Sequence, residues 1–352
     1  MTNALMNDVT HGAARDGTNR TDTAPAAVPE ARGAAAGPAD PARTPELSCY
    51  TAALVAYLEP ELPDVGDRLA RAIRLSVRTD HPSGRLAFSH HSRIDGEDAS
   101  GLLAYGGTAH WPEALAALRA EARRNGRVLA VANTRTVPWS PAYEVSTAAH
   151  WVLLEPAPGQ ADAWQVTDRF AALLPEGEQR PHTGVVDDTA LRALLAPLGT
   201  LAPQYTLRDV HALGTAVELP GPEQYRWLER HSSAPTAPPV GRWLHAQAES
   251  LAFLAARLGA DPALLAAHAD DLWAASRHQR HRLEFLARTG AVSRAAAEAA
   301  AASWGSFPAP SASPSPRPSG AARAPESSRR PSTTSSGPRH AYRRRNSADV
   351  RP

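Results

Sequence analysis

Two proline-rich ends limit how much of this 352-residue chain can fold. The first 44 residues show no apolar periodicity and contain four prolines, and residues 304–352 are again rich in Pro, Ser, Ala and Arg. Such segments bury too little apolar surface to offset the entropy that they lose on ordering. We therefore expect a disordered N-terminal tail at 1–44 and a disordered basic tail at 304–352. About 260 residues remain between them, enough for one large core or two modest domains.

The composition of the chain argues against a nucleic-acid partner and against a membrane span. The net charge is only +1, and all 37 basic residues are arginine, a pattern that indicates a GC-rich genome more than an anion-binding surface. No stretch reaches 18 uninterrupted apolar residues, and residues 1–37 have no apolar signal core. We expect a cytoplasmic protein with neither nucleic acid nor a membrane as its partner.

Cys49 is the only cysteine, and it stands where a helix is predicted to begin. A single cysteine excludes an internal disulfide framework and a cysteine-based zinc site. Apolar side chains recur at helical spacing up to Leu58, Ser48 suits the N-cap position, and Pro60 ends the pattern. The positive end of a helix dipole favours the thiolate, which is the nucleophilic form of a cysteine. A lone cysteine is also compatible with a buried and inert role.

Helix and strand signals are mixed after this first helix, which predicts an α+β fold. We expect, in order, a helix at 65–75, an irregular or β-containing stretch at 78–107, a helix at 111–124, strands at 127–132, 150–154 and 163–168, and a helix at 189–195. The strands at 150–154 and 163–168 form a hairpin, because prolines and a glycine separate them.

The chain changes character after about residue 230. Three prolines between 231 and 239 predict a linker, and residues 240–303 predict an all-helical module without a strand partner. Its helices are expected at 242–258, 262–288 and 291–302. The predicted domains are therefore 45–230, the linker 231–239 and the helical module 240–303.

Cys49, His150 and Asp168 stand in an order that nucleophilic catalysis can use. An imidazole can take the proton of a thiol and later return it to a leaving group. The hairpin brings Asp168 back beside His150, where a carboxylate would fix the ring and stabilise its protonated form. Free amides in the first turn of the Cys49 helix would serve as part of an oxyanion hole. The alternative for Asp168 is that it simply begins the turn after its strand.

Three short blocks of the sequence resemble the butirosin-type (BtrH-like) acyltransferase family. The blocks are Cys49-Tyr50-Thr51-Ala52-Ala53-Leu54, His150-Trp151-Val152-Leu153-Leu154 and Val166-Thr167-Asp168. The resemblance covers about 45–230 and implies a papain-like (C39-peptidase-like) cysteine domain there. It implies Cys49 as the acylated nucleophile, His150 as the base and Asp168 as the residue that orients it.

The same resemblance implies the reaction and its partners. Members of the family move an acyl group from an acyl-carrier-protein thioester to an amine, in the biosynthesis of antibiotics and other specialised metabolites. The expected partners are therefore an acyl carrier protein or another acyl-thioester donor, and an amine-bearing small molecule or peptide. No cofactor and no metal are expected, although phosphopantetheine can enter as part of the carrier-bound substrate.

Two positions differ from the family pattern and leave alternatives open. Members usually have His immediately before the cysteine, where this chain has Ser48, and C39-like peptidases have an oxyanion Gln where this chain has Arg43. One alternative is a cysteine peptidase or amidase of the same fold. The other is a catalytically degenerate relative that acts as a binding or scaffold protein.

The remaining histidines and arginines favour no additional site. His278 and His281 share a predicted helix face, which we expect to lie at the surface, because no further ligand stands at a recognisable metal-site spacing. The basic run of Arg277, Arg280 and Arg282 offers a contact for an acidic carrier protein or a phosphate, and is more simply interpreted as a solvated helix face.

Overall fold

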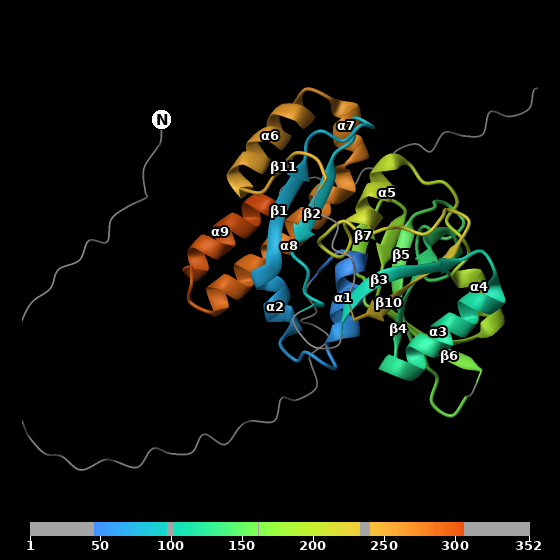
Figure 1. The fold of residues 1–352 in the computed structure, drawn as a ribbon. Coiled ribbons are helices and arrows are strands. Elements are labelled where there is room, and N and C mark those ends of the chain that lie inside the picture. Colours follow the sequence, from blue (N-terminus) through green and yellow to red (C-terminus); the bar gives the residue numbers. More distant parts are fainter. Residues whose placement is uncertain (1–45, 97–100, 161, 233–239, 306–352) are drawn as a thin grey trace, which may run out of the picture. The chain divides into compact units, whose positions relative to one another are not determined.

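Two larger antiparallel sheets and a small two-stranded one organise the part of the chain that the structure describes (Figure 1). The computed structural model describes residues 46–96, 101–160, 162–232 and 240–305. These residues form both helices and strands, which confirms the predicted α+β class. The predicted tail at 1–44, nearly all of the predicted tail at 304–352 and most of the predicted linker at 231–239 lie outside the described residues.

The described helices begin and end as follows: α1 (Cys49–Leu58), α2 (Val65–Ala72), α3 (Trp111–Asn125), α4 (Asp188–Leu194), α5 (Pro203–Val210), α6 (Gln247–Gly259), α7 (Pro262–Ala267), α8 (Ala269–Arg288) and α9 (Arg294–Gly305). The strands are β1 (Ile73–Arg78), β2 (Ala87–His91), β3 (Leu102–Thr108), β4 (Val128–Asn133), β5 (Ala149–Pro156), β6 (Ala163–Asp168), β7 (Ala172–Leu174), β8 (Gly177–Gln179), β9 (His182–Asp187), β10 (Tyr225–His231) and β11 (Trp243–Leu244).

The six-stranded sheet has the order β3-β10-β4-β5-β6-β9 and is covered by helices on both faces. Alternation along β4 separates the two cores, because successive side chains of a strand point to opposite faces. Leu129 and Val131 pack in the core that contains α1, whereas Val128 and Ala130 pack in the core that contains α3 and α4. The predicted hairpin is confirmed as the antiparallel pair β5 and β6.

The smaller sheet, β11-β1-β2, shares its core with the C-terminal helices. Leu75 and Val77 of β1 pack with Leu254 of α6 and Leu272 of α8. The prediction of an all-helical module without a strand partner at 240–303 is therefore wrong, since Trp243–Leu244 pairs with β1. Chain segments far apart in sequence bury each other here, and the described residues between 46 and 305 group into one compact unit.

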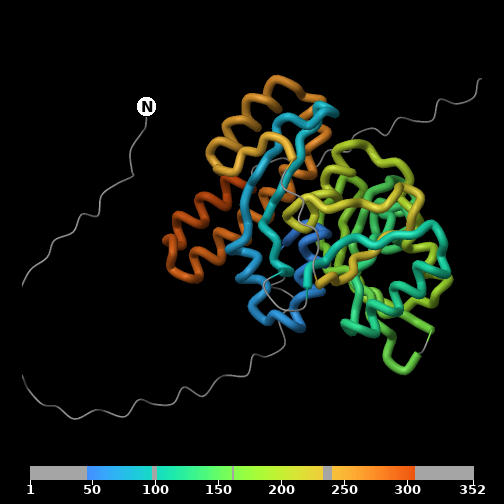
Figure 2. The backbone as a smooth tube through the Cα atoms, viewed as in Figure 1, coloured from blue at the N-terminus to red at the C-terminus, as the bar shows by residue number. Residues whose placement is uncertain are grey.

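Helix α1 is a central element of this unit. It packs against β4 and β5, while the following helix α2 packs against α8. In Figure 2 the blue segment that carries both helices accordingly runs between the green sheet and the orange C-terminal helices. As predicted, Ser48 is the N-cap of α1, and its hydroxyl oxygen accepts a hydrogen bond from the Thr51 amide at 3.4 Å.

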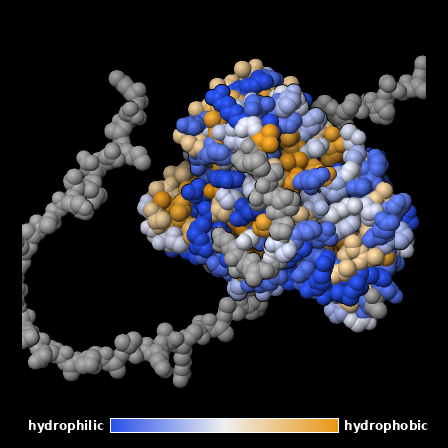
Figure 3. Space-filling view, viewed as in Figure 1, coloured by the Kyte–Doolittle hydropathy of each residue, from blue (hydrophilic) through white to orange (hydrophobic). Residues whose placement is uncertain are grey.

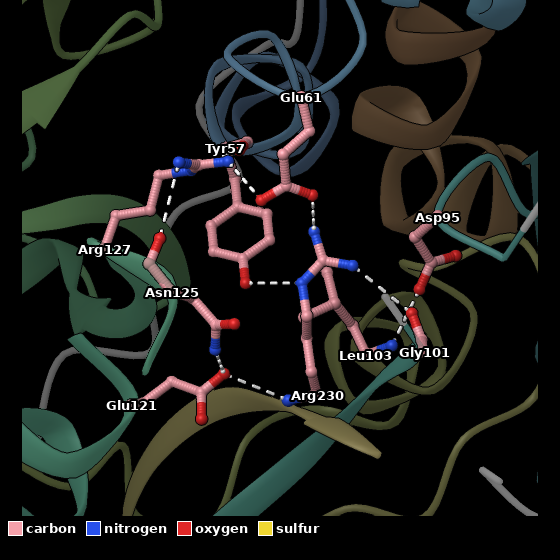
Figure 4. A network of polar contacts seen from close by, with 9 residues as sticks. All are labelled: Tyr57, Glu61, Asp95, Gly101, Leu103, Glu121, Asn125, Arg127 and Arg230. Atoms are coloured by element: carbon pink, nitrogen blue, oxygen red, sulfur yellow. Dashed lines mark hydrogen bonds and ion pairs between the residues drawn. The ribbon is translucent and has the colours of Figure 1, made fainter. Parts of the chain in front are cut away.

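A polar network fixes the C-terminal end of α1 to the sheet (Figure 4). The carboxylate of Glu61 accepts from both Arg127 and Arg230, each at 2.6 Å. The ring of fully buried Tyr57 lies between these guanidinium groups, with their central carbons 5.0 and 5.1 Å from the ring centroid. Arg230 also donates to the Tyr57 hydroxyl at 2.9 Å. Cation–π and charged hydrogen bonds therefore hold this end of the helix.

Replacing Tyr57 with phenylalanine is expected to lower the free energy of unfolding by about 1–2 kcal/mol, because a buried guanidinium loses one hydrogen-bond partner while the ring contacts remain. Chemical denaturation followed by circular dichroism measures the change. Tyr143→Phe is the matched control, since Tyr143 is 42% exposed and should shift stability by less than about 0.5 kcal/mol. Equal effects of the two substitutions would show that the network does not stabilise the fold.

Hydrophilic side chains predominate on the face shown in Figure 3, with groups of hydrophobic side chains among them. Six large hydrophobic side chains of the described residues are exposed: Tyr143, Val145, Leu173, Val185, Val240 and Leu265. Within the described ranges, no helix combines the length and the apolar character that a membrane span requires.

Candidate active site

The packing of α1 on β5 brings the predicted nucleophile and base to the same place. Tyr50 and Trp151 meet edge to face, with ring centroids 5.1 Å apart and an interplanar angle of 86°. Each of these aromatic residues directly follows a candidate site residue, Cys49 on the helix and His150 on the strand. The partly exposed Cys49 and the buried His150 line one cavity together.

The register of the hairpin places Asp168 beside His150. Leu153 of β5 pairs with Thr167 of β6, so continuing the register by one residue sets Asp168 opposite Val152. Asp168 is then a diagonal neighbour of His150, on the same side of the sheet. His150 Nε2 and Asp168 Oδ2 are 2.8 Å apart, and both side chains are at most 5% exposed.

Asp168 accepts hydrogen bonds from three groups that the sequence did not indicate. Trp139 Nε1 donates to Oδ2 at 2.8 Å, Gln179 Nε2 donates to the same oxygen at 3.3 Å, and the Phe170 amide donates to Oδ1 at 2.9 Å. The Trp139 ring is itself stacked on His182 with centroids 4.1 Å apart. The carboxylate is thus fixed in position by donors on several loops and strands, and it faces the imidazole in one orientation.

These contacts decide the charge of the pair. Burial alone would lower the pKa of His150, but the Asp168 carboxylate, together with hydrogen bonding and charge from Cys49, raises that pKa to about 10. Burial works against the Asp168 carboxylate in the same way, yet the His150 charge and the hydrogen bonds from His150, Trp139 and Phe170 lower its pKa. Because Nε2 faces Asp168, Nδ1 is the ring nitrogen that remains for the thiol. At neutral pH His150 is therefore an imidazolium, which lies between the Asp168 carboxylate and the Cys49 sulfur.

A cavity of about 410 Å³ opens beside this group. Its lining comes from segments far apart in the sequence, including Phe170 after β6 and Trp273 from α8. Several alanines and these aromatic rings make much of the wall apolar. A small acyl chain or a flat apolar group fits a surface of this kind.

Apart from the Cys49–His150–Asp168 group, the charged side chains in the cavity wall leave it with negative charge. Glu176, Arg208 and Asp270 line it. Arg208 is already paired with buried Asp271 at 2.9 Å and with Asp270 at 3.4 Å, so its charge is compensated. The wall therefore attracts a cationic group more than an anionic one.

The first turn of α1 also borders the cavity through Ser48, Cys49 and Tyr50. The leading amides of a helix have no intrahelical acceptor. The Thr51 amide donates to the Ser48 cap, which leaves the amides of Cys49 and Tyr50 as the candidates for stabilising an oxyanion. Arg43, which stands where C39-like peptidases have an oxyanion Gln, lies outside the described residues.

Two predictions about the C-terminal helices need correction. His278 is 1% exposed rather than on a surface helix face, because α8 packs its side toward β2 and α1. Arg277 is not simply solvated, since its guanidinium lies 4.0 Å from the Trp273 ring centroid and donates to the Ala171 carbonyl.

Among the residues with described positions, no group of three or more His, Cys, Asp or Glu side chains is arranged to hold a metal ion.

Replacing Asp168 with asparagine is expected to lower the rate of any reaction at Cys49 by about 10²- to 10⁴-fold. The four groups described around Asp168 all donate, so the amide NH₂ of asparagine would have to face a donor, and the negative charge would be lost. Steady-state kinetics with an acyl thioester measures the loss. Asp162→Asn on the same hairpin is the control, because its side chain is 84% exposed. Comparable losses in both variants would remove Asp168 from the site.

The pair should also make stability depend on pH. The contribution of His150 to the free energy of unfolding is fully present below the ordinary pKa of 6.5. It is lost as the pH rises toward about 10, because the folded state keeps a proton that the unfolded state releases. The contribution of Asp168 to the free energy of unfolding is present above the ordinary carboxyl pKa of 3.8 and is lost in acid, as the pH falls through the lowered pKa of the folded state. The difference in free energy of unfolding between wild type and Asp168→Asn should therefore be larger at pH 5.5 than at pH 10. A difference that is constant over this range would contradict a charged pair.

Comparison with known proteins brings no assignment, since no protein-family model and no curated protein matches the chain.

Proposed function

We propose that this protein is a thiol-dependent acyltransferase with a papain-like cysteine site, which moves an acyl group from a carrier-protein thioester to an amine in specialised-metabolite biosynthesis. The observation that carries the proposal is the convergence of Cys49, His150 and Asp168 at one cavity, with the imidazole between carboxylate and thiol. A cysteine at a helix start, packed on an antiparallel sheet that supplies the histidine, is an arrangement that can place the groups of such a site together.

In the first half of the reaction, the Cys49 thiolate attacks the carbonyl carbon of the carrier-bound thioester. The new carbon–sulfur bond forms and the carbonyl oxygen becomes an oxyanion, which the first-turn amides of α1 stabilise. The bond to the carrier sulfur then breaks, and the His150 imidazolium gives its proton to the departing thiolate. The products are an acyl-Cys49 thioester and the free carrier thiol.

In the second half, a neutral amine attacks the acyl-Cys49 carbonyl and His150 accepts the amine proton. Collapse of the second oxyanion releases the amide and the Cys49 thiolate, which restores the starting ion pair. The negative cavity wall at Glu176 and Asp270 supports an amine as acceptor, because a substrate with a further ammonium group would bind there.

The direct test is intact-protein mass spectrometry after incubation with short acyl-pantetheine thioesters. Wild type is expected to gain the mass of one acyl group, and Cys49→Ala is expected to gain none. Adding a diamine at neutral pH should discharge the adduct faster than buffer alone and should yield the acylated amine.

Each other result has a clear meaning. No adduct on wild type, or an equal adduct on Cys49→Ala, would overturn the proposal and leave the binding or scaffold alternative. An adduct that buffer discharges as quickly as the amine does would reassign the site to hydrolysis, as in a peptidase or amidase.

A further inference from the structure

The N-cap of the nucleophile helix is joined to α8 by a chain of three side chains. Ser48 Oγ lies 2.9 Å from Thr51 Oγ1, and Thr51 Oγ1 lies 2.8 Å from His278 Nε2. His278 Nδ1 lies 2.7 Å from the Ala274 carbonyl oxygen one turn earlier in α8. Thr51 and His278 are at most 2% exposed, so the chain is shielded from water.

The direction of every hydrogen bond in this chain follows from its far end. The Ala274 carbonyl can only accept, so His278 Nδ1 carries a hydrogen. Burial and the neighbouring His90 and His91 lower the pKa of His278 well below 6.5, so the ring is neutral and Nε2 accepts. Thr51 must then donate its single hydroxyl hydrogen to Nε2.

The Ser48 hydroxyl is oriented by the same logic. Since the Thr51 hydrogen is committed to His278, Ser48 must be the donor in the Ser48–Thr51 bond. Its oxygen then keeps a lone pair for the Thr51 amide, the capping bond at 3.4 Å. One arrangement of hydrogens satisfies all four groups, and it fixes the residue that directly precedes Cys49.

The His278 ring is itself held in place from the side. The His90 ring of β2 stacks on it with centroids 5.4 Å apart and an interplanar angle of 16°. His90 also lines the cavity beside Cys49. The acceptor for Thr51 is therefore a rigid group, not a mobile surface side chain.

We propose that His278 is a positioning residue, which acts through Thr51 and Ser48 to hold the first turn of α1 and thereby the Cys49 thiol in its reactive orientation. The inference rests on the proposed function only in taking Cys49 as the nucleophile. It makes α8 a part of the active site although α8 supplies no reacting group.

The test uses alkylation of the single cysteine by iodoacetamide in the full-length protein, at neutral pH and under conditions where circular dichroism shows every variant folded. His278→Leu removes the acceptor and is expected to slow alkylation about 5- to 20-fold, the range that one hydrogen bond accounts for. His278→Gln keeps an acceptor for Thr51 and is expected to remain within about threefold of wild type. His281→Gln changes a residue of the same helix that makes no hydrogen bond to Ser48, Thr51 or His278, so this variant should react like wild type.

A second variant keeps the test decisive if His278→Leu does not fold. Thr51→Val has nearly the shape of threonine but no hydroxyl, so by itself it should slow alkylation by a similar factor. Where His278→Leu folds, adding it to Thr51→Val should slow the reaction little further. A wild-type alkylation rate in Thr51→Val or in folded His278→Leu would overturn the inference. Equal losses of rate in His278→Leu and His278→Gln would also overturn it.

Alkylation needs no acyl donor, so the two proposals fail separately. A protein whose Cys49 follows the expected variant pattern but never gains an acyl group would overturn the proposed function and leave the role of His278 intact. If acyl transfer is observed, His278→Leu should lower kcat with KM nearly unchanged, as expected for a misplaced nucleophile and an intact substrate cavity.

Discussion

Cys49→Ser is expected to lower the rate of acyl transfer by about 10⁴-fold or more, because a serine hydroxyl does not ionise beside an imidazolium as a thiol does. The substitution changes one atom at the start of α1 and preserves the packing of its neighbours on β5. Loss of rate with an unchanged unfolding midpoint would therefore report on chemistry. Single-turnover kinetics with an acyl-pantetheine thioester measures the effect.

A thiol moved within the cavity is the matched control for this prediction. Ser146 also lines the cavity, so Cys49→Ser combined with Ser146→Cys keeps one cysteine near the substrate but away from the helix start. This double variant should carry no acyl adduct and should turn over no faster than Cys49→Ser. Transfer at more than a tenth of the wild-type rate in either variant would mean that the Cys49 thiol is not the nucleophile.

The local parts of the site could be predicted from the sequence because short-range signals determine them. The serine cap and the apolar spacing after Cys49 define α1, and these signals lie within about ten residues. The His150 and Asp168 strands form a hairpin with a short turn, so their pairing needs no knowledge of distant segments. The existence of a cysteine helix and of a histidine–aspartate pair therefore followed from local patterns.

The partners of Asp168 could not be predicted in this way. Trp139 lies in the segment before β5, and Gln179 is the last residue of β8 in the two-stranded ribbon of β7 and β8. Nothing in the residue types at these positions distinguishes a donor to a catalytic carboxylate from a surface side chain. The large number of donors is visible only once the fold has brought the loops together.

The packing partner of the C-terminal helices could not be predicted for a related physical reason. Their apolar faces predict burial, but periodicity does not say against which element a helix packs. The partner is the β1–β2 pair, which lies about 170 residues earlier in the chain than α6. Packing on these strands turns His278 inward, so a histidine that the helix pattern placed on the surface lies next to the nucleophile helix.

His150→Ala is expected to be almost as damaging as loss of the thiol, with acyl transfer slowed about 10³- to 10⁴-fold. In the proposed mechanism the substitution removes the cation beside the Cys49 sulfur, the acid for the leaving carrier thiol and the base for the incoming amine. Iodoacetamide should accordingly react much more slowly with Cys49 at pH 6, where wild-type His150 is fully protonated because its pKa is about 10. Both the acyl-transfer rate and the alkylation rate are measured on the same preparation.

Two further variants separate this chemistry from a general disturbance of the buried site. His150→Gln can still donate to Asp168 but cannot exchange a proton, so it should fold like wild type and transfer no faster than His150→Ala. His110→Ala, at an exposed histidine before α3, should retain wild-type rates. Imidazole added to His150→Ala should restore part of the rate, because the emptied space adjoins the open cavity. A glutamine variant with near wild-type transfer would exclude His150 as the proton carrier, whatever its distance from Asp168.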